Sequence, residues 1–129
     1  MNPLLSAAAV AAGGALGSVA RLLVGTWFLQ RFGPGFPWGT FAINVSGSFA
    51  IGLVLALAET RVGLNPYARL AVATGILGGY TTFSTFAYEA YLLGRDALTL
   101  QSVSYAIGSV VASIVAVVAG VALARAAFS

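Results

Sequence analysis

The sequence predicts an all-α membrane protein that crosses the bilayer with four helices. Of its 129 residues, 60% are hydrophobic and only 7% are charged, whereas a soluble domain has about 25% charged residues. The apolar residues form four long stretches, each close to the roughly 20 residues that span a bilayer as a helix. Short polar turns separate these stretches. Consecutive helices therefore run in opposite directions, and both termini lie on one side of the membrane.

The boundaries of the four stretches follow from the residues that interrupt them. The first stretch, residues 3–29, ends at a turn (residues 30–37) that contains two Gly and two Pro, residues that interrupt helices. The other three stretches cover residues 38–58, 67–93 and 102–127. Because only short turns join them, we expect residues 1–129 to form a single four-helix transmembrane domain.

The composition also excludes several classes of function. The chain has no Cys and no His, which removes disulfides, thiolate metal sites and imidazole chemistry. Its net charge of +3 comes from scattered Arg residues, which is not the clustered basic patch of a nucleic-acid-binding protein. We therefore expect no nucleic-acid partner. Ser84 has no evident general base among the spans, so we do not expect an enzyme either.

The positive charges are almost evenly divided between the two ends of the predicted bundle. Loops rich in Lys and Arg normally stay cytoplasmic, so a chain without a clear bias can insert in both orientations. Two copies in opposite orientations would form an inverted pair, a symmetry on which transport proteins build sites at the membrane midplane. An antiparallel, dual-topology homodimer is one interpretation, and a single fixed orientation is the other. The side with the termini carries Arg61, Arg69 and Arg125, and the other side carries Arg31 and Arg95, with Arg21 nearer to it.

The third stretch is predicted to contain a helix that is broken near its middle. Residues 78–86 begin with two Gly and place four hydroxyl residues within five positions. Gly is a poor helix former, and Ser and Thr compete for backbone hydrogen bonds. Broken helices at membrane depth occur where the backbone is buried or lines a cavity. There, freed carbonyls can bind a cation, and freed N–H groups at a half-helix N-terminus favour an anion.

Two sets of polar residues recur every four positions, which puts each set on one helix face. In the second stretch these are Thr40, Asn44 and Ser48. The Asn44 amide offers two N–H donors, which suit an anion without adding a fixed charge, although an interhelical hydrogen bond would also explain it. The fourth stretch carries a similar set, for which hydrogen bonds from Ser to the backbone of its own helix are the alternative. That set is Tyr105, Ser109 and Ser113.

Four further side chains in the spans are candidates for function. Phe83 and Phe86 are three residues apart, and their positive ring edges could meet an anion, although ordinary packing also explains two Phe. Arg21 could reach the interface or attract anions into a vestibule. Glu89 lies on the same face as Phe86 and could be the coupling site of a proton-coupled transporter, or it could serve a pairing role.

Small residues four positions apart predict where helices approach closely in lipid. The abundance of Gly in membrane helices is the alternative explanation. The pairs are Gly13 with Gly17, Gly14 with Ser18, Ser48 with Gly52, and Gly75 with Gly79.

Three segments together resemble the motifs of the Fluc (CrcB) family of fluoride channels. They are residues 13–21, 39–49 and 75–86, in that order along a four-span chain. The resemblance implies a dual-topology homodimer with two narrow pores between the subunits, in the inner or plasma membrane of the cell. It also implies passive, selective export of fluoride, which protects the cell from this toxic ion.

The same resemblance implies roles for individual residues. Asn44 would donate to fluoride, and Phe83 and Phe86 would present ring edges to it. A structural sodium ion at the dimer interface would be held by the backbone carbonyls of Gly78 and Thr81 from both subunits. Arg21 would lie in a vestibule. The remaining pore residues would be Thr40, Ser48, Tyr105, Ser109 and Ser113, with Ser84 or Thr85 nearby.

Two other classes of membrane protein fit the sequence less well. A proton-coupled small multidrug transporter also has four spans and dual topology, but it needs a carboxylate in its first helix, and residues 3–29 have none. In a purely structural membrane protein, polar side chains aligned along one helix face would have no role.

Overall fold

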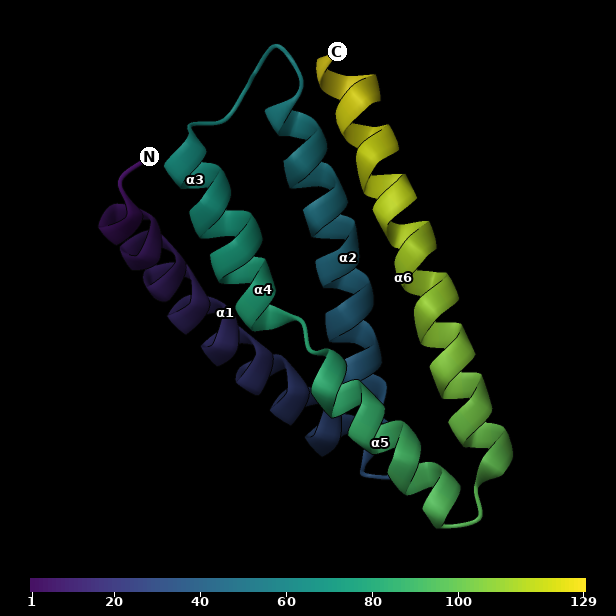
Figure 1. The fold of residues 1–129 in the computed structure, drawn as a ribbon. Coiled ribbons are helices and arrows are strands. Elements are labelled where there is room, and N and C mark those ends of the chain that lie inside the picture. Colours follow the sequence, from purple (N-terminus) through teal and green to yellow (C-terminus); the bar gives the residue numbers. More distant parts are fainter.

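The computed structural model describes residues 1–129 and is all-helical, without strands (Figure 1). Three long helices, α1 (Pro3–Phe32), α2 (Trp38–Ala58) and α6 (Thr99–Phe128), agree with the predicted first, second and fourth stretches. The predicted third stretch is a chain of shorter helices: α3 (Pro66–Arg69), the π-helix η1 (Leu70–Leu77), α4 (Gly78–Tyr80) and α5 (Phe83–Arg95). Both termini lie at the same end of the bundle, as predicted (Figure 1).

The predicted break in the third stretch is confirmed, and it falls between α4 and α5. Thr81 and Thr82 have extended backbone conformations, with ψ angles of 157° and 117°. The sequence did not predict the π-helical winding of η1. Three helices are long and apolar enough to cross a membrane, and the break leaves neither half of the third stretch that long.

An Asn-Pro dipeptide begins both α1 and α3, the two helices that start at the end of the bundle where the termini lie. Asn2 precedes Pro3, and its side chain accepts a hydrogen bond from the N–H of Leu4 at 2.9 Å. Asn65 precedes Pro66, and its side chain accepts from the N–H of Tyr67, also at 2.9 Å. Pro suits the first helical position because its missing N–H would be unpaired there in any case.

Glycines set the distance between α1 and the first half of the broken helix. A Cβ atom at Gly13 would lie 3.0 Å from the Cα of Gly75, and one at Gly79 would lie 2.6 Å from the carbonyl oxygen of Gly14. A Cβ at Gly17 would lie 2.9 Å from the backbone nitrogen of Tyr80. Side chains at these positions would push the helices apart, so the prediction of close approach at these small residues is confirmed.

Close backbone contact also joins α2 to α6. A Cβ at Gly52 would lie 3.1 Å from the Cα of Val117, as the pairing of Ser48 with Gly52 predicted. Gly120 makes the reciprocal contact, because a Cβ there would lie 2.8 Å from the backbone nitrogen of Leu53. The sequence analysis did not single out Gly120. The bundle therefore consists of α1 packed on α3–α4 and of α2 packed on α6, with α5 continuing beyond the break to pack against α6 (Figure 1).

Large apolar side chains cover the outside of the bundle. Leu16 on α1 and Ile114 on α6 are examples, with 65% and 60% of their surface exposed. In water such a surface would be a liability, but lipid is as apolar as these side chains. The exterior therefore agrees with the predicted bilayer environment.

Candidate functional site at the helix break

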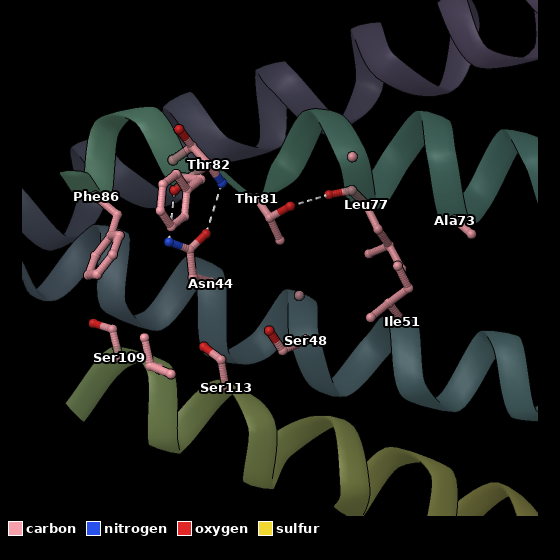
Figure 2. A pocket seen from close by; sticks show the side chains of 14 residues that line it. Asn44, Ser48, Ile51, Ala73, Leu77, Thr81, Thr82, Phe86, Ser109 and Ser113 are labelled. Carbon is pink, nitrogen blue, oxygen red and sulfur yellow. Dashed lines mark hydrogen bonds between the residues drawn. The ribbon is translucent and has the colours of Figure 1, made fainter. Parts of the chain in front are cut away.

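A cavity of about 310 Å³ lies beside the helix break, between α2, the two half-helices and α6 (Figure 2). None of the 14 residues that line it is charged. The wall combines neutral hydrogen-bonding side chains with aromatic rings and glycine backbone. Eight residues singled out from the sequence line this cavity: Asn44, Ser48, Gly78, Thr81, Phe83, Phe86, Ser109 and Ser113.

Asn44 binds the backbone directly at the break. Its Nδ2 donates to the carbonyl oxygen of Thr82 at 2.9 Å, and its Oδ1 accepts from the N–H of Thr82 at 2.8 Å (Figure 2). Asn44 thus makes the interhelical contact that was the alternative to an anion-binding role. The amide nitrogen has two N–H groups, and the contact to Thr82 uses one of them. The other can still serve an anion in the cavity.

The break leaves backbone carbonyls without their helical donors. In a continuous helix the Thr82 N–H would donate to the carbonyl of Gly78, but here it donates to Asn44. The Thr81 carbonyl accepts no hydrogen bond within the chain. Leu77 keeps its partners, because both the N–H and the hydroxyl of Thr81 donate to its carbonyl, at 3.0 and 2.9 Å. Oxygen atoms of this kind are the ligands that hard cations prefer.

Arg21 also reaches the break. Its Nε donates to the carbonyl oxygen of Gly79 at 3.0 Å. Arg21 is half-buried against the broken helix and has no acidic partner, since the one ion pair of the chain joins Arg95 to Asp96. The guanidinium group therefore lies at the break itself rather than in a separate surface region.

Ser109 is the most informative polar residue of the cavity wall. The residue is 95% buried, and its hydroxyl has no hydrogen-bond partner in the chain. A buried hydroxyl without a partner costs free energy, so it either weakens the fold or serves a ligand. Ser113 lies one turn further along α6 and also lines the cavity (Figure 2).

The two phenylalanines that follow the break have different surroundings. Phe83 is 78% exposed. Phe86 is buried in a cluster with Leu93 and Tyr105, and its ring centroid lies 5.1 Å from that of Tyr105. The packing explanation therefore applies to part of Phe86, whereas packing within the chain does not account for Phe83.

Thr40 and Tyr105 are directed toward Glu89 and do not line the cavity. The Thr40 hydroxyl donates to one carboxylate oxygen of Glu89 at 2.6 Å, and the Tyr105 hydroxyl donates to the other at 3.3 Å. The structure thus pairs Glu89 with two hydroxyls, in agreement with the pairing role considered from the sequence. Thr40 and Tyr105, one from each of the two predicted sets of polar residues, therefore bind Glu89 in the single chain.

Among the lining residues that the sequence analysis left out, Thr82 is the one that hydrogen-bonds to Asn44. Besides its bonds to Asn44, its hydroxyl caps α5 by accepting from the N–H of Thr85 at 3.2 Å. The predicted residues Ser84 and Thr85 lie in the first turn of α5 and do not line the cavity. Ser84 is exposed, and its hydroxyl is 3.5 Å from that of Thr82. The signal for Thr82 was its position immediately before a helix start, where Thr is a favoured cap.

Comparisons with known proteins agree with one another over most of the chain. Residues 8–121 match the family described as CrcB-like protein, Camphor Resistance (CrcB). The chain is 51% identical over 117 residues to the "Fluoride-specific ion channel FluC" of Rhizobium meliloti strain 1021, which covers 91% of this chain and 94% of that protein. It is 50% identical over 123 residues to the protein of the same name from Agrobacterium fabrum strain C58, covering 95% and 98%.

A third relative gives a similar result. The chain is 46% identical over 125 residues to the "Fluoride-specific ion channel FluC" of Chloroflexus aurantiacus strain J-10-fl, covering 97% of each protein. Together with the apolar helices, this similarity identifies a multi-pass integral protein of the cell membrane, as predicted. With three sequence motifs, a broken third helix and family similarity from residue 8 to residue 121, the chain belongs to the CrcB family.

Proposed function

We propose that the chain forms a fluoride-selective ion channel, which exports fluoride passively and so protects the cell from fluoride toxicity. The observation that carries the proposal is the uncharged cavity at the break, with the buried, unpartnered hydroxyl of Ser109 in its wall. The relatives named above are fluoride-specific ion channels. They are channels rather than enzymes, which agrees with the prediction that the chain catalyses no reaction.

The chemistry of the cavity suits a small anion that must pass through rather than stay. A channel site has to replace part of the hydration shell, yet bind weakly enough to release the ion. The free N–H of Asn44, the hydroxyls of Ser109 and Ser113 and the ring edges of Phe83 and Phe86 are weak donors. A fixed positive charge in the wall would hold the anion more tightly, and the wall has none.

The pore itself is proposed to form between two copies of the chain in opposite orientations. Phe83 is exposed although it borders the uncharged cavity, and a second copy would cover it and enclose the ion pathway. The near balance of Arg residues between the two ends of the bundle supports insertion in both orientations. The lipid bilayer and a second copy are thus the proposed partners, and fluoride is the transported ion.

A structural sodium ion is proposed at the interface between the two copies. The carbonyl groups of Gly78 and Thr81 fit this role because both lack hydrogen-bond donors at the break. Unwound backbone carbonyls at broken membrane helices are suitable sodium ligands. Bound there, sodium would neutralise the negative C-terminal end of the first half-helix of each copy and so join the copies.

The test is fluoride efflux from liposomes that contain this protein alone, measured with a fluoride electrode. The expected result is rapid fluoride efflux driven by the fluoride gradient, with no corresponding chloride efflux. Efflux should continue when the proton gradient is collapsed. Efflux that stops without a proton gradient would point instead to a proton-coupled transporter, with Glu89 as the coupling carboxylate. Absence of fluoride efflux from correctly assembled protein would overturn the proposal.

A further inference from the structure

We infer that Arg21 is a positioning residue of the helix break, which holds the Gly79 carbonyl and thereby directs the neighbouring Gly78 carbonyl toward the proposed cation. This inference rests on the sodium site of the proposed function. It assigns Arg21 a mechanical task in addition to the attraction of anions. The Nε of Arg21 lies 3.0 Å from the carbonyl oxygen of Gly79, 58 residues along the chain.

The need for such a residue comes from the local backbone. The first half of the broken helix ends in Gly78-Gly79-Tyr80, and Gly has more conformational freedom than any other residue. The carbonyls at the end of this half-helix also lack the donors that a continuing helix would supply. Without other support, the Gly78 carbonyl would sample many directions.

The structure supplies that support on both sides of the proposed ligands. Before Gly78, the Leu77 carbonyl is held by two donors from Thr81. After it, the Gly79 carbonyl is held by Arg21. The Thr81 carbonyl is followed by Thr82, whose N–H and carbonyl are both held by Asn44. Each free carbonyl therefore lies next to a peptide group that a neighbouring helix holds in place.

The reach of Arg21 depends on the close packing of α1. Gly14, Ser18 and Arg21 lie on one face of α1 and all approach Gly79. A Cβ at Gly79 would lie 2.6 Å from the Gly14 carbonyl oxygen and 3.1 Å from the Ser18 hydroxyl. Because the two helices touch through their backbones here, the Arg21 side chain starts beside Gly79 and its Nε can return to the carbonyl.

Arg is well suited to this contact for electrostatic reasons. The C-terminal end of a helix is the negative end of its dipole, so a cation is favoured beside the last carbonyls. A hydrogen bond from a guanidinium group to a carbonyl is also stronger than one between neutral groups. Only Nε makes a hydrogen bond within the chain, so the terminal amino groups of the guanidinium remain free to face water or an anion.

Three substitutions separate the hydrogen bond from the charge. In Arg21→Gln, the amide nitrogen occupies the same bond position along the side chain as the Nε of Arg, so the donor is kept and the charge is lost. In Arg21→Met, a side chain of similar length has neither. In Arg21→Lys, the charge is kept, but the nitrogen lies one bond further out and lacks the geometry of the guanidinium group.

The measurement is thermal unfolding of the purified protein in detergent, as sodium chloride replaces N-methylglucamine chloride at constant ionic strength. The parent protein should be stabilised by sodium, with a measurable half-saturating concentration. Arg21→Gln should retain a value close to that of the parent. Arg21→Met should require at least about tenfold more sodium, the factor expected from losing a hydrogen bond to a charged partner.

The outcomes distinguish this inference from the proposed function. If sodium does not stabilise the parent, the sodium site is wrong and the role of Arg21 falls with it. If sodium stabilises the parent and the Gln and Met variants respond equally, only the positioning role is overturned. If Arg21→Met does not fold, the Gln and Lys variants decide. The positioning role requires the half-saturating sodium concentration of Arg21→Gln to be closer to that of the parent than the value of Arg21→Lys is. The reverse order would show that only the charge matters.

Discussion

Asn44 and Thr82 are joined by two hydrogen bonds, which connect α2 to the residue that directly precedes α5. The amide nitrogen of Asn44 donates to the Thr82 carbonyl at 2.9 Å, and the Thr82 N–H donates to the amide oxygen at 2.8 Å (Figure 2). One side chain thus replaces the backbone partners that Thr82 would have in a continuous helix. The same side chain borders the proposed anion pathway, so the shape of the break and the binding of the ion are connected.

Replacement of Asn44 by Leu should therefore affect both stability and transport. Leu has a similar volume but leaves the N–H and carbonyl of Thr82 unpaired, at a cost of about 1–3 kcal/mol for each unsatisfied group. We expect a lower unfolding temperature and strongly reduced fluoride efflux, with a dimer still present by size-exclusion chromatography. Ser46→Ala is the control, because the Ser46 hydroxyl lies 3.0 Å from the Tyr80 hydroxyl and outside the cavity wall, so the substitution removes a polar contact to the same broken helix without affecting Thr82. Parent-level efflux in Asn44→Leu would mean that the amide is not needed for conduction.

Ser109→Ala should separate transport from stability. The Ser109 hydroxyl is buried without a partner, so its removal should leave the unfolding free energy unchanged or raise it by up to about 1 kcal/mol. Fluoride efflux should nevertheless fall, because the anion loses a donor.

Ser102→Ala is the matched control for the Ser109 substitution. The Ser102 hydroxyl donates to the Ala90 carbonyl at 2.7 Å, away from the residues that line the cavity. Its loss should lower stability and leave efflux intact. If Ser109→Ala conducts like the parent, its hydroxyl does not contact the ion.

Replacement by Ile should reduce fluoride transport at both Phe83 and Phe86, but it should destabilise the fold only at Phe86. Ile keeps an apolar side chain but removes the positive ring edge. Both substitutions should reduce fluoride efflux strongly, and Met, which keeps the bulk and is more polarisable, should retain part of it. Phe86→Ile should also destabilise the fold by about 1–3 kcal/mol, because Phe86 packs against Leu93 and Tyr105.

Phe83→Ile gives the cleaner comparison. Phe83 is 78% exposed in the single chain, so its replacement should change the stability of the subunit by less than about 0.5 kcal/mol, and size-exclusion chromatography should check that the dimer, which would cover Phe83, is retained. Reduced efflux without loss of stability would then report on the ion pathway. If both Ile variants conduct at the parent rate, the rings serve only in packing.

The orientation of the chain can be tested by cysteine labelling. The chain has no Cys, so one Cys introduced near the C-terminus is a unique reporter. In intact cells a membrane-impermeant thiol reagent should label about half of the protein if both orientations occur. Adding two or three Lys beside Arg125 should shift the labelling to a single side. Labelling of the parent from one side only would exclude dual topology.

Hydropathy and turn residues were sufficient to predict the four stretches, their antiparallel order and the common side of the termini. A bilayer requires long apolar segments whose backbone is paired within each helix, and such segments are visible in a single sequence. The break was predictable for a related reason, since Gly78-Gly79 and the hydroxyl residues after them weaken a helix locally. The small-residue pairs on α1 likewise identified the face that packs on η1 and α4.

The partners of individual polar atoms could be identified only from the tertiary structure. Helical spacing put Asn44 and Thr40 on the same face of α2, yet Asn44 binds Thr82 and Thr40 binds Glu89. Likewise, the sequence left open whether Arg21 reaches the interface or lies in a vestibule. Its hydrogen bond to Gly79 depends on how closely Gly14 lets α1 approach. Spacing along one helix determines which side chains share a face, whereas their partners depend on the distance and rotation between helices, which packing of all the helices together decides.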